Sequence, residues 1–287
     1  MKDEGQNKRV MTTTCAVSVG VADVRRAPDP TSERVTQALL NMRAIAGDSS
    51  GEWTHVTLAD YEGWMRTDEL AEPPVRGFCK IGEHCGTPLD LVAVVTATHT
   101  PLYADLTGDE AWGSVYLSSV LPLLDMTPPE RLQVALPGGD SAWIARDAIS
   151  VRQGTAPYPR QPISVVTAYA RAFLGVPYLW GGTSWRGIDC SGFVQLCYRM
   201  GGYIIPRDAD QQHDALPRRI EGEEMREGDL IFFGRQRITH VGMALNNKEY
   251  IHSKGGSGVI INSFDPGHAH YDQHLAEIVR ALKRVVF

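Results

Sequence analysis

Cys190, in the segment "RGIDCSGF", stands where it could act as a nucleophile. Asp189 is a good helix N-cap, and Phe193, Leu196 and Met200 follow at three- to four-residue spacing, which predicts a helix beginning at Cys190. Unpaired N–H groups and the positive end of the helix dipole favour a thiolate there and can hold an oxyanion. A lone helical cysteine is more often buried, but the flanking glycines let a ligand approach the backbone. We therefore expect a reactive thiol.

Two histidines supply the base that a cysteine nucleophile requires. The segment "THVGMALNNKEYIHS" predicts a hairpin with His240 on its first strand and His252 on its second. A three-residue loop, Asn246–Lys248, pairs Gly242 with His252 and leaves His240 one diagonal away, within reach of a second imidazole. We expect His240 to face the thiol and His252 to lie behind it.

Three domains are expected to hold these residues. Short β-runs with period-two alternation fill residues 12–72, which is typical of a small all-β barrel. Residues 88–152 have the same rhythm, and "YEGWMRTDEL" corresponds to "DSAWIARDAI", so we interpret them as a divergent copy. "EPPVRG" and "RQGTAPYPRQP" are linkers. Residues 160–287 read as helices followed by an antiparallel sheet, which makes this part α+β.

Composition limits the partners. The 287 residues carry a formal net charge of −6 with no basic block, which argues against binding to nucleic acid or to an anionic membrane. The first residues lack the apolar region of a signal peptide, and no stretch of about 18 apolar residues could span a bilayer. We therefore expect a cytoplasmic protein without a membrane partner.

The cysteines do not predict a disulfide framework, because there are five of them in a chain of this length. Cys197 falls on the apolar face of the predicted helix and is expected in the core. "CKIGEHC" groups Cys79, His84 and Cys85, but the spacing is not that of a zinc knuckle and no second half follows. We expect a plain loop and no metal.

Five motifs in order carry a resemblance to a known family: "YLWGGTSWRGIDCSGF", "PRDADQQ", "GDLIFF", "THVGMAL" and "YIHSKG". Over about residues 160–287 the chain resembles the NlpC/p60 cysteine peptidases, papain-like hydrolases of bacterial cell-wall peptides. The two upstream barrels resemble bacterial SH3-like (SH3b) domains. The resemblance thus implies two small SH3-like barrels followed by an α+β papain-like catalytic domain.

The resemblance also implies catalytic roles. Cys190 corresponds to the nucleophile, His240 to the general base, and His252 to the polar residue that orients the imidazole. Tyr178, in "PYLWGG", aligns with the tyrosine whose hydroxyl helps to form the oxyanion hole, although such a residue is ordinarily a half-buried aromatic. No metal and no organic cofactor is implied.

Members with this three-domain layout resemble γ-D-glutamyl-L-diamino acid endopeptidases of the dipeptidyl-peptidase VI kind, which cut after γ-D-Glu in peptides that begin with a free L-Ala. Such an amine needs carboxylates and a ring around it. The residues implied in substrate binding are Glu33, Tyr61, Trp180, Asp189, Ser191, Arg207 and Asp208. For Glu33 a solvated loop charge, and for Tyr61 a place on the barrel surface, stay open as alternatives. Ala209 stands where a small hydroxyl residue is usual, so one substrate hydrogen bond is lost or replaced by water.

We expect a cytoplasmic cysteine peptidase that trims murein peptides for recycling, with the peptide L-Ala-γ-D-Glu-diamino acid as its partner. An exported hydrolase of intact cell wall and a non-catalytic SH3b wall-binding protein are the alternatives. If the first barrel covers the groove, with Glu33 and Tyr61 near Asp189, only short peptides with free amines fit. The sequence does not indicate which diamino acid is preferred, diaminopimelate or lysine, nor the oligomeric state or the role of the second barrel.

Overall fold

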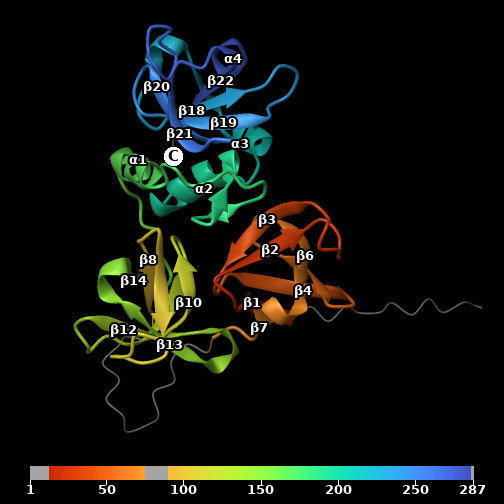
Figure 1. Cartoon of the computed structure of the whole chain (residues 1–287), viewed down its shortest axis with the longest axis vertical. Helices are drawn as coiled ribbons and strands as arrows, with labels where there is room; N and C mark the ends of the chain where they lie inside the picture. The colour runs from red at the N-terminus through yellow and green to blue at the C-terminus, as the bar shows by residue number, and fades with distance from the viewer. Residues whose placement is uncertain (1–12, 75–89, 286–287) are drawn as a thin grey trace, which may run out of the picture.

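The structure, a computed structural model, describes residues 13–74 and 90–285 (Figure 1). The predicted loop around Cys79, His84 and Cys85 lies outside the described residues. The described chain forms a first sheet domain (residues 13–71), a second sheet domain (residues 91–153) and a C-terminal domain of helices packed on an antiparallel sheet. Strand therefore dominates the secondary structure.

The first sheet domain has seven strands in the order β3-β2-β6-β5-β4-β1-β7. Buried and more exposed residues alternate along β2 and β6, because alternate side chains of a strand face the core. A short 3-10 turn, η1 (Thr67–Glu69), leads into the last strand. The strands are β1 (Thr13–Val17), β2 (Val21–Arg25), β3 (Arg34–Leu39), β4 (Arg43–Ser50), β5 (Trp53–Thr57), β6 (Glu62–Arg66) and β7 (Leu70–Ala71).

The second sheet domain has the strand order β10-β9-β13-β12-β11-β8-β14, which is the order of the first domain with every number raised by seven. Its last strand also follows a 3-10 turn, η3 (Arg146–Ala148), and another turn, η2 (Pro137–Gly139), precedes β13. The two segments that the sequence pairs, "YEGWMRTDEL" and "DSAWIARDAI", thus end in the same strand–turn–strand unit. The strands are β8 (Leu91–Val95), β9 (His99–Tyr103), β10 (Ala111–Tyr116), β11 (Val120–Asp125), β12 (Arg131–Ala135), β13 (Ser141–Ala145) and β14 (Ile149–Gln153).

The C-terminal domain contains a six-stranded sheet in the order β17-β22-β18-β19-β20-β21, with every pair antiparallel. Its helices are α1 (Ile163–Ala172), α2 (Cys190–Met200), α3 (Ala209–Ala215) and α4 (Gln273–Glu277), with a 3-10 turn η4 (Gly222–Glu224). Its strands are β15 (Thr183–Ser184), β16 (Gly187–Ile188), β17 (Arg218–Ile220), β18 (Leu230–Phe233), β19 (His240–Ala244), β20 (Glu249–Lys254), β21 (Gly258–Ser263) and β22 (Val279–Arg284). Among the described residues, no helix has the length and apolar character needed to cross a membrane.

Helix α2 forms the centre of this domain, because it packs against α1 on one side and β19 and β20 on the other. Phe193, Leu196, Cys197 and Met200, its predicted apolar face, are all buried in one cluster with residues of β19 and β20. The prediction that Cys197 belongs to the core is therefore confirmed. The helix starts at Cys190, as its spacing predicts, so the thiol is held by a fully packed element.

The first sheet domain contacts the C-terminal domain closely near the start of α2. The Gln37 side chain accepts a hydrogen bond from Thr183 N (3.1 Å), and Arg34 Nη1 donates to Trp180 O (3.1 Å). Gly181 has φ +71°, and a Cβ there would lie 2.5 Å from Arg34 O. Only glycine allows both this backbone conformation and this approach of the two domains.

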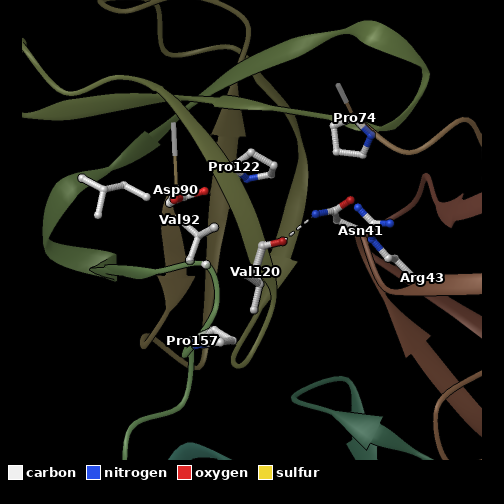
Figure 2. A pocket seen from close by; sticks show the side chains of 10 residues that line it. Asn41, Arg43, Pro74, Asp90, Val92, Val120, Pro122 and Pro157 are labelled. Carbon is white, nitrogen blue, oxygen red and sulfur yellow. Dashed lines mark hydrogen bonds between the residues drawn. The ribbon is translucent and has the colours of Figure 1, made fainter. Parts of the chain in front are cut away.

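The second sheet domain contacts both other domains. Figure 2 shows the Asn41 amide donating to Val120 O (2.7 Å), which joins it to the first sheet domain. Beside this bond lies a cavity of about 220 Å³, and none of the predicted site residues lines it. On the other side, the ring of His99 stacks on Trp185 of the C-terminal domain, with centroids 6.1 Å apart. The second sheet domain is therefore in contact with both the first sheet domain and the C-terminal domain.

Candidate active site

The thiol of Cys190 is held at the first turn of α2 by the residue before it. The Asp189 carboxylate accepts from Gly192 N (2.6 Å), which makes Asp189 the N-cap of the helix. Cys190 is only 7% exposed, yet it lines a cavity of about 500 Å³. A buried sulfur with one open side can meet a substrate that has been stripped of water.

Both the first sheet domain and the C-terminal domain line this cavity. The residues predicted for catalysis or binding that line it are Glu33, Tyr61, Tyr178, Trp180, Asp189, Cys190, Ser191 and Asp208. Segments more than a hundred residues apart in sequence therefore meet around the thiol. Of the predicted binding residues, only Arg207 lies off this wall.

The histidine hairpin has the predicted register. Met243 pairs with Ile251, and Leu245 N donates to Glu249 O (2.8 Å), which leaves a three-residue loop between the strands. Gly242 therefore lies opposite His252, and a Cβ on Gly242 would come within 3.3 Å of the His252 Cβ. One diagonal away, His240 Nε2 is 2.7 Å from His252 Nδ1. The small residue at position 242 leaves room for the two rings to meet.

Asn262 on β21 sets the direction of this hydrogen bond. Its Nδ2 donates to His270 O (2.8 Å), so its Oδ1 faces His252 Nε2 (2.8 Å) and accepts the proton of that nitrogen. His252 Nδ1 then carries a lone pair and accepts from His240 Nε2. The remaining nitrogen of His240, Nδ1, is left without a proton and can act as a base.

Sequence reasoning missed Asn262. It lies in the β-run "GVIINSF", and on β21 it is two residues beyond Ile260, the direct partner of His252. A polar residue directly after the apolar residues Val259, Ile260 and Ile261 is a signal in itself. Its meaning depends on the register of the second hairpin, whose loop "GGS" also has three residues.

Burial sets the resting protonation of the site. It raises the pKa of the Cys190 thiol to about 12, and the Asp189 carboxylate adds to the rise. It lowers the pKa of His240 to about 3, and the neighbouring His252 adds to the fall. Desolvation of the thiol thus opposes the effect of the helix dipole, and the thiolate expected at the helix start stays a prediction. The backbone of Val241, the residue after His240, lies close enough to hydrogen-bond the Cys190 sulfur, so His240 remains the predicted acceptor of the thiol proton.

Tyr178 is half-buried on the wall of the same cavity, and a parallel bridge to Ile188 holds its backbone beside the start of α2. Burial raises the pKa of its hydroxyl, and the nearby Cys190 and Asp189 raise it further. The hydroxyl is thus a proton donor throughout the ordinary pH range. Together with the free N–H groups of the first turn of α2, it can donate to an oxyanion.

Arg207 lies behind the wall, with 2% exposure, and does not reach the cavity. Its guanidinium binds both oxygens of Asp189 (3.0 and 2.6 Å) and the hydroxyl of Ser191 (3.0 Å). Its Nε donates to Thr36 Oγ1 of the first sheet domain (2.9 Å). Arg207 thus fixes Asp189 and Ser191 from behind, and its predicted contact with substrate stays a prediction.

Two further contacts hold the first sheet domain over the thiol. The Glu33 carboxylate accepts from Trp180 Nε1 (3.0 Å) and from Arg26 Nε (2.6 Å), and Arg26 keeps the pKa of Glu33 low. Tyr61 OH donates to Asp208 Oδ2 (3.1 Å). Glu33 and Tyr61 are therefore parts of the cavity wall rather than isolated surface groups.

Within residues 13–74 and 90–285, no three His, Cys, Asp or Glu side chains come together in a way that could hold a metal ion. Cys15, Cys190 and Cys197 are free cysteines in the same part of the chain. The polar groups around Cys190 suit acid–base and nucleophilic chemistry.

Comparisons with known proteins show which family this chain resembles. Residues 175–280 match the sequence profile of the NlpC/P60 family, and residues 24–70 match that of the bacterial dipeptidyl-peptidase SH3 domain. The chain is 30% identical over 232 residues to a γ-D-glutamyl-L-lysine dipeptidyl-peptidase of Bacillus cereus, an alignment that covers 76% of this chain and 66% of that protein. A protein of the same name from Bacillus subtilis is 29% identical over 242 residues, with coverage of 79% and 74%. The family resemblance seen in the sequence is thereby confirmed.

A solved structure has the same fold. The crystal structure of an NlpC/P60 family protein from Bacillus cereus aligns with 95% of this chain and 99% of its own, with a TM-score of 0.80 and 24% sequence identity. That alignment includes all three domains. Their arrangement is therefore shared with a known protein.

We expect Thr36→Val, a substitution in the first sheet domain, to slow catalysis at Cys190 in the C-terminal domain. The substitution leaves the buried Arg207 Nε–H without an acceptor, which costs about 1–3 kcal/mol and loosens Asp189 and the start of α2. The measurement is kcat and KM below the unfolding transition, with Thr36→Ser restoring the hydroxyl.

Thr54→Val is the matched control, because Thr54 is an equally buried threonine whose hydroxyl bonds Thr67 within the first sheet domain (2.9 Å). It should lower stability but leave kcat unchanged. Equal effects of Thr36→Val and Thr54→Val on kcat would contradict the role given to Thr36.

A second prediction concerns the thiol and its base. In His240→Gln the Cys190 thiol has lost its proton acceptor, so alkylation by iodoacetamide should be very slow at pH 7. The alkylation rate should then rise about tenfold per pH unit into the alkaline range, because the fraction of thiolate is now set by the raised pKa of the thiol. Alkylation rates across pH, followed by mass spectrometry, measure this. His274→Ala, an exposed histidine on α4, is the control, and unchanged alkylation of His240→Gln at pH 7 would refute the coupling.

Proposed function

This chain belongs to the NlpC/P60 family through residues 175–280, and from that membership we propose that it is a cysteine peptidase that cleaves after γ-D-Glu in murein peptides with a free N-terminal L-Ala. The observation that carries the proposal is the shared cavity. Carboxylates from two domains and the Cys190 thiol line one space of about 500 Å³, and the first sheet domain forms part of its wall.

The proposed reaction uses the side chains in a fixed order. Cys190 passes its proton to Nδ1 of His240 while the sulfur attacks the γ-carbonyl carbon. N–H groups at the start of α2 and the Tyr178 hydroxyl donate to the oxyanion. His240 then gives the proton to the departing amine, and a thioester to Cys190 remains. A water molecule, deprotonated by His240, attacks the thioester, and the sulfur leaves with that proton.

The free amine of the substrate is assigned to the carboxylate-rich part of the cavity. Glu33 is ionised and fixed by Arg26 and Trp180, so its position does not depend on substrate. Asp189 adds a second carboxylate, although Arg207 already neutralises much of its charge. An ammonium group can donate charge-assisted hydrogen bonds to these carboxylates, whereas an acylated nitrogen carries no positive charge for them to bind.

Ser191 and Asp208 are assigned to the γ-D-Glu residue. Both line the cavity, and each is held by another side chain, Ser191 by Arg207 and Asp208 by Tyr61. Ala209 lines the cavity beside them and offers no hydroxyl. In this proposal Arg207 is a positioning residue, and water takes the place of the hydroxyl missing at position 209.

The finer fold assignments are supported by strand order and by the place of the nucleophile. The repeated strand order supports a second, divergent SH3-like barrel over the predicted residues 88–152. A cysteine at a helix start, packed on an antiparallel sheet that carries the histidine, supports a papain-like arrangement for residues 160–287. The SH3 match at residues 24–70 lies within the first proposed barrel, residues 12–72, and supports it.

Recycling of murein fragments in the cytoplasm is the setting that suits this site. A cavity bounded by a second domain favours short peptides over polymer, which weighs against an exported hydrolase of intact wall. The relay of Cys190, His240 and His252 weighs against a wall-binding protein without activity.

The test compares L-Ala-γ-D-Glu-diamino acid with its N-acetylated form. We expect acetylation to lower kcat/KM about 10- to 100-fold, the range for losing one hydrogen bond to a charged group. Glu33→Gln should reduce that discrimination, and Cys190→Ala should abolish cleavage of both peptides. Equal rates for the two substrates would refute the assignment to free-amine peptides.

A further inference from the structure

The loop between β18 and β19 forms part of the active-site wall that the mechanism does not use. Arg237, Ile238 and Thr239 line the cavity immediately before His240. In the proposed reaction His240 protonates the departing amine, so the leaving diamino acid must lie beside this loop. This placement of the leaving residue rests on the proposed function.

The loop is well anchored, so its residues keep a fixed relation to His240. Gly234 N donates to Ile278 O (2.9 Å) and Thr239 N donates to Phe233 O (2.9 Å), which closes the turn at its base. Gly234 has φ +147°, and a Cβ there would lie 1.9 Å from Arg237 O. Ile238 packs against the core. Arg237 is exposed, but its backbone is not free to move away.

Within residues 13–74 and 90–285, no side chain pairs with the charge of Arg237, whereas Arg26 and Arg207 are both paired. Arg26 is bound to Glu33 (2.6 Å) and Arg207 to Asp189 (2.6 Å). Within the described part of the chain, the Arg237 guanidinium makes no hydrogen bond or ion pair with another side chain, so it can bind an anion.

The two diamino acids of murein peptides differ in the group that such a guanidinium recognises. Lysine ends in an ammonium group, whereas the distal carbon of diaminopimelate carries both an ammonium group and a carboxylate. Asp210 lines the same cavity and suits the ammonium group of either. The carboxylate is what distinguishes them, and it is the natural partner of an unpaired guanidinium.

We propose that Arg237 binds the side-chain carboxylate of the leaving residue, so that this site prefers diaminopimelate to lysine. The two Bacillus relatives bear names that specify lysine. This chain would therefore differ from the two relatives in the diamino acid that it accepts after the scissile bond, whereas the type of bond cleaved would be the same.

The experiment measures kcat/KM for L-Ala-γ-D-Glu-meso-diaminopimelate and L-Ala-γ-D-Glu-L-Lys. We expect the unsubstituted protein to prefer the diaminopimelate peptide about tenfold, the effect of one charge-assisted hydrogen bond. Arg237→Gln should bring the ratio close to one, and Arg237→Glu should invert it. Arg235→Gln is the matched control, since Arg235 is an exposed arginine of the same loop that does not line the cavity.

A third substrate, with the α-carboxylate of D-Glu converted to an amide, tests the other carboxylate nearby. If the effect of Arg237→Gln disappears with this peptide, Arg237 serves the glutamyl residue and the proposal is overturned. The proposal is also overturned if Arg237→Gln leaves unchanged the ratio of kcat/KM for the diaminopimelate peptide to kcat/KM for the lysine peptide, even if both peptides are cleaved. Failure of the unsubstituted protein to cleave either peptide would instead overturn the proposed function.

Discussion

The hydrogen bond between Nε2 of His240 and Nδ1 of His252 runs in one direction, and the chemistry proposed for Cys190 depends on that direction. Asn262 fixes it from the far end, because its amide nitrogen is already committed to the carbonyl of His270. Were the chain of donors reversed, Nδ1 of His240 would carry the proton and could not accept one from the thiol. Because burial raises the pKa of the thiol and lowers that of the imidazole, it favours the uncharged form of both, and the proposed proton transfer would supply the nucleophilic sulfur.

A second buried network positions the thiol from the opposite side, and it crosses a domain boundary. Thr36 of the first sheet domain holds Arg207, Arg207 holds Asp189, and Asp189 caps the helix that begins at Cys190. Each member is almost fully buried, so losing one leaves its neighbour unsatisfied. The first sheet domain thus does two things: it walls the cavity through Glu33 and supports the catalytic helix through Thr36. This explains why Cys190 and the residues proposed for binding line one cavity.

Much of the site could be predicted from local rules. The cap at Asp189 and the apolar spacing behind it predict the helix start, and the loop length predicts the histidine register. Three features could not be reached in this way. The position of Arg207 behind the cavity wall could not be predicted, because its partner Thr36 lies 171 residues away in sequence. The contact of Asn262 with His252 depends on the register of a second hairpin. The resting protonation of Cys190 depends on tertiary burial, which no local motif reveals.

The most direct test is to locate the ring protons of His240 and His252 by proton–nitrogen NMR near neutral pH, with nitrogen-15-labelled histidine and assignment by His240→Gln. The relay predicts neutral rings that both carry their proton on Nε2, with Nδ1 of His240 bare. A proton found on Nδ1 of His240 would mean that this imidazole cannot receive one from sulfur, and the relay would not operate as described.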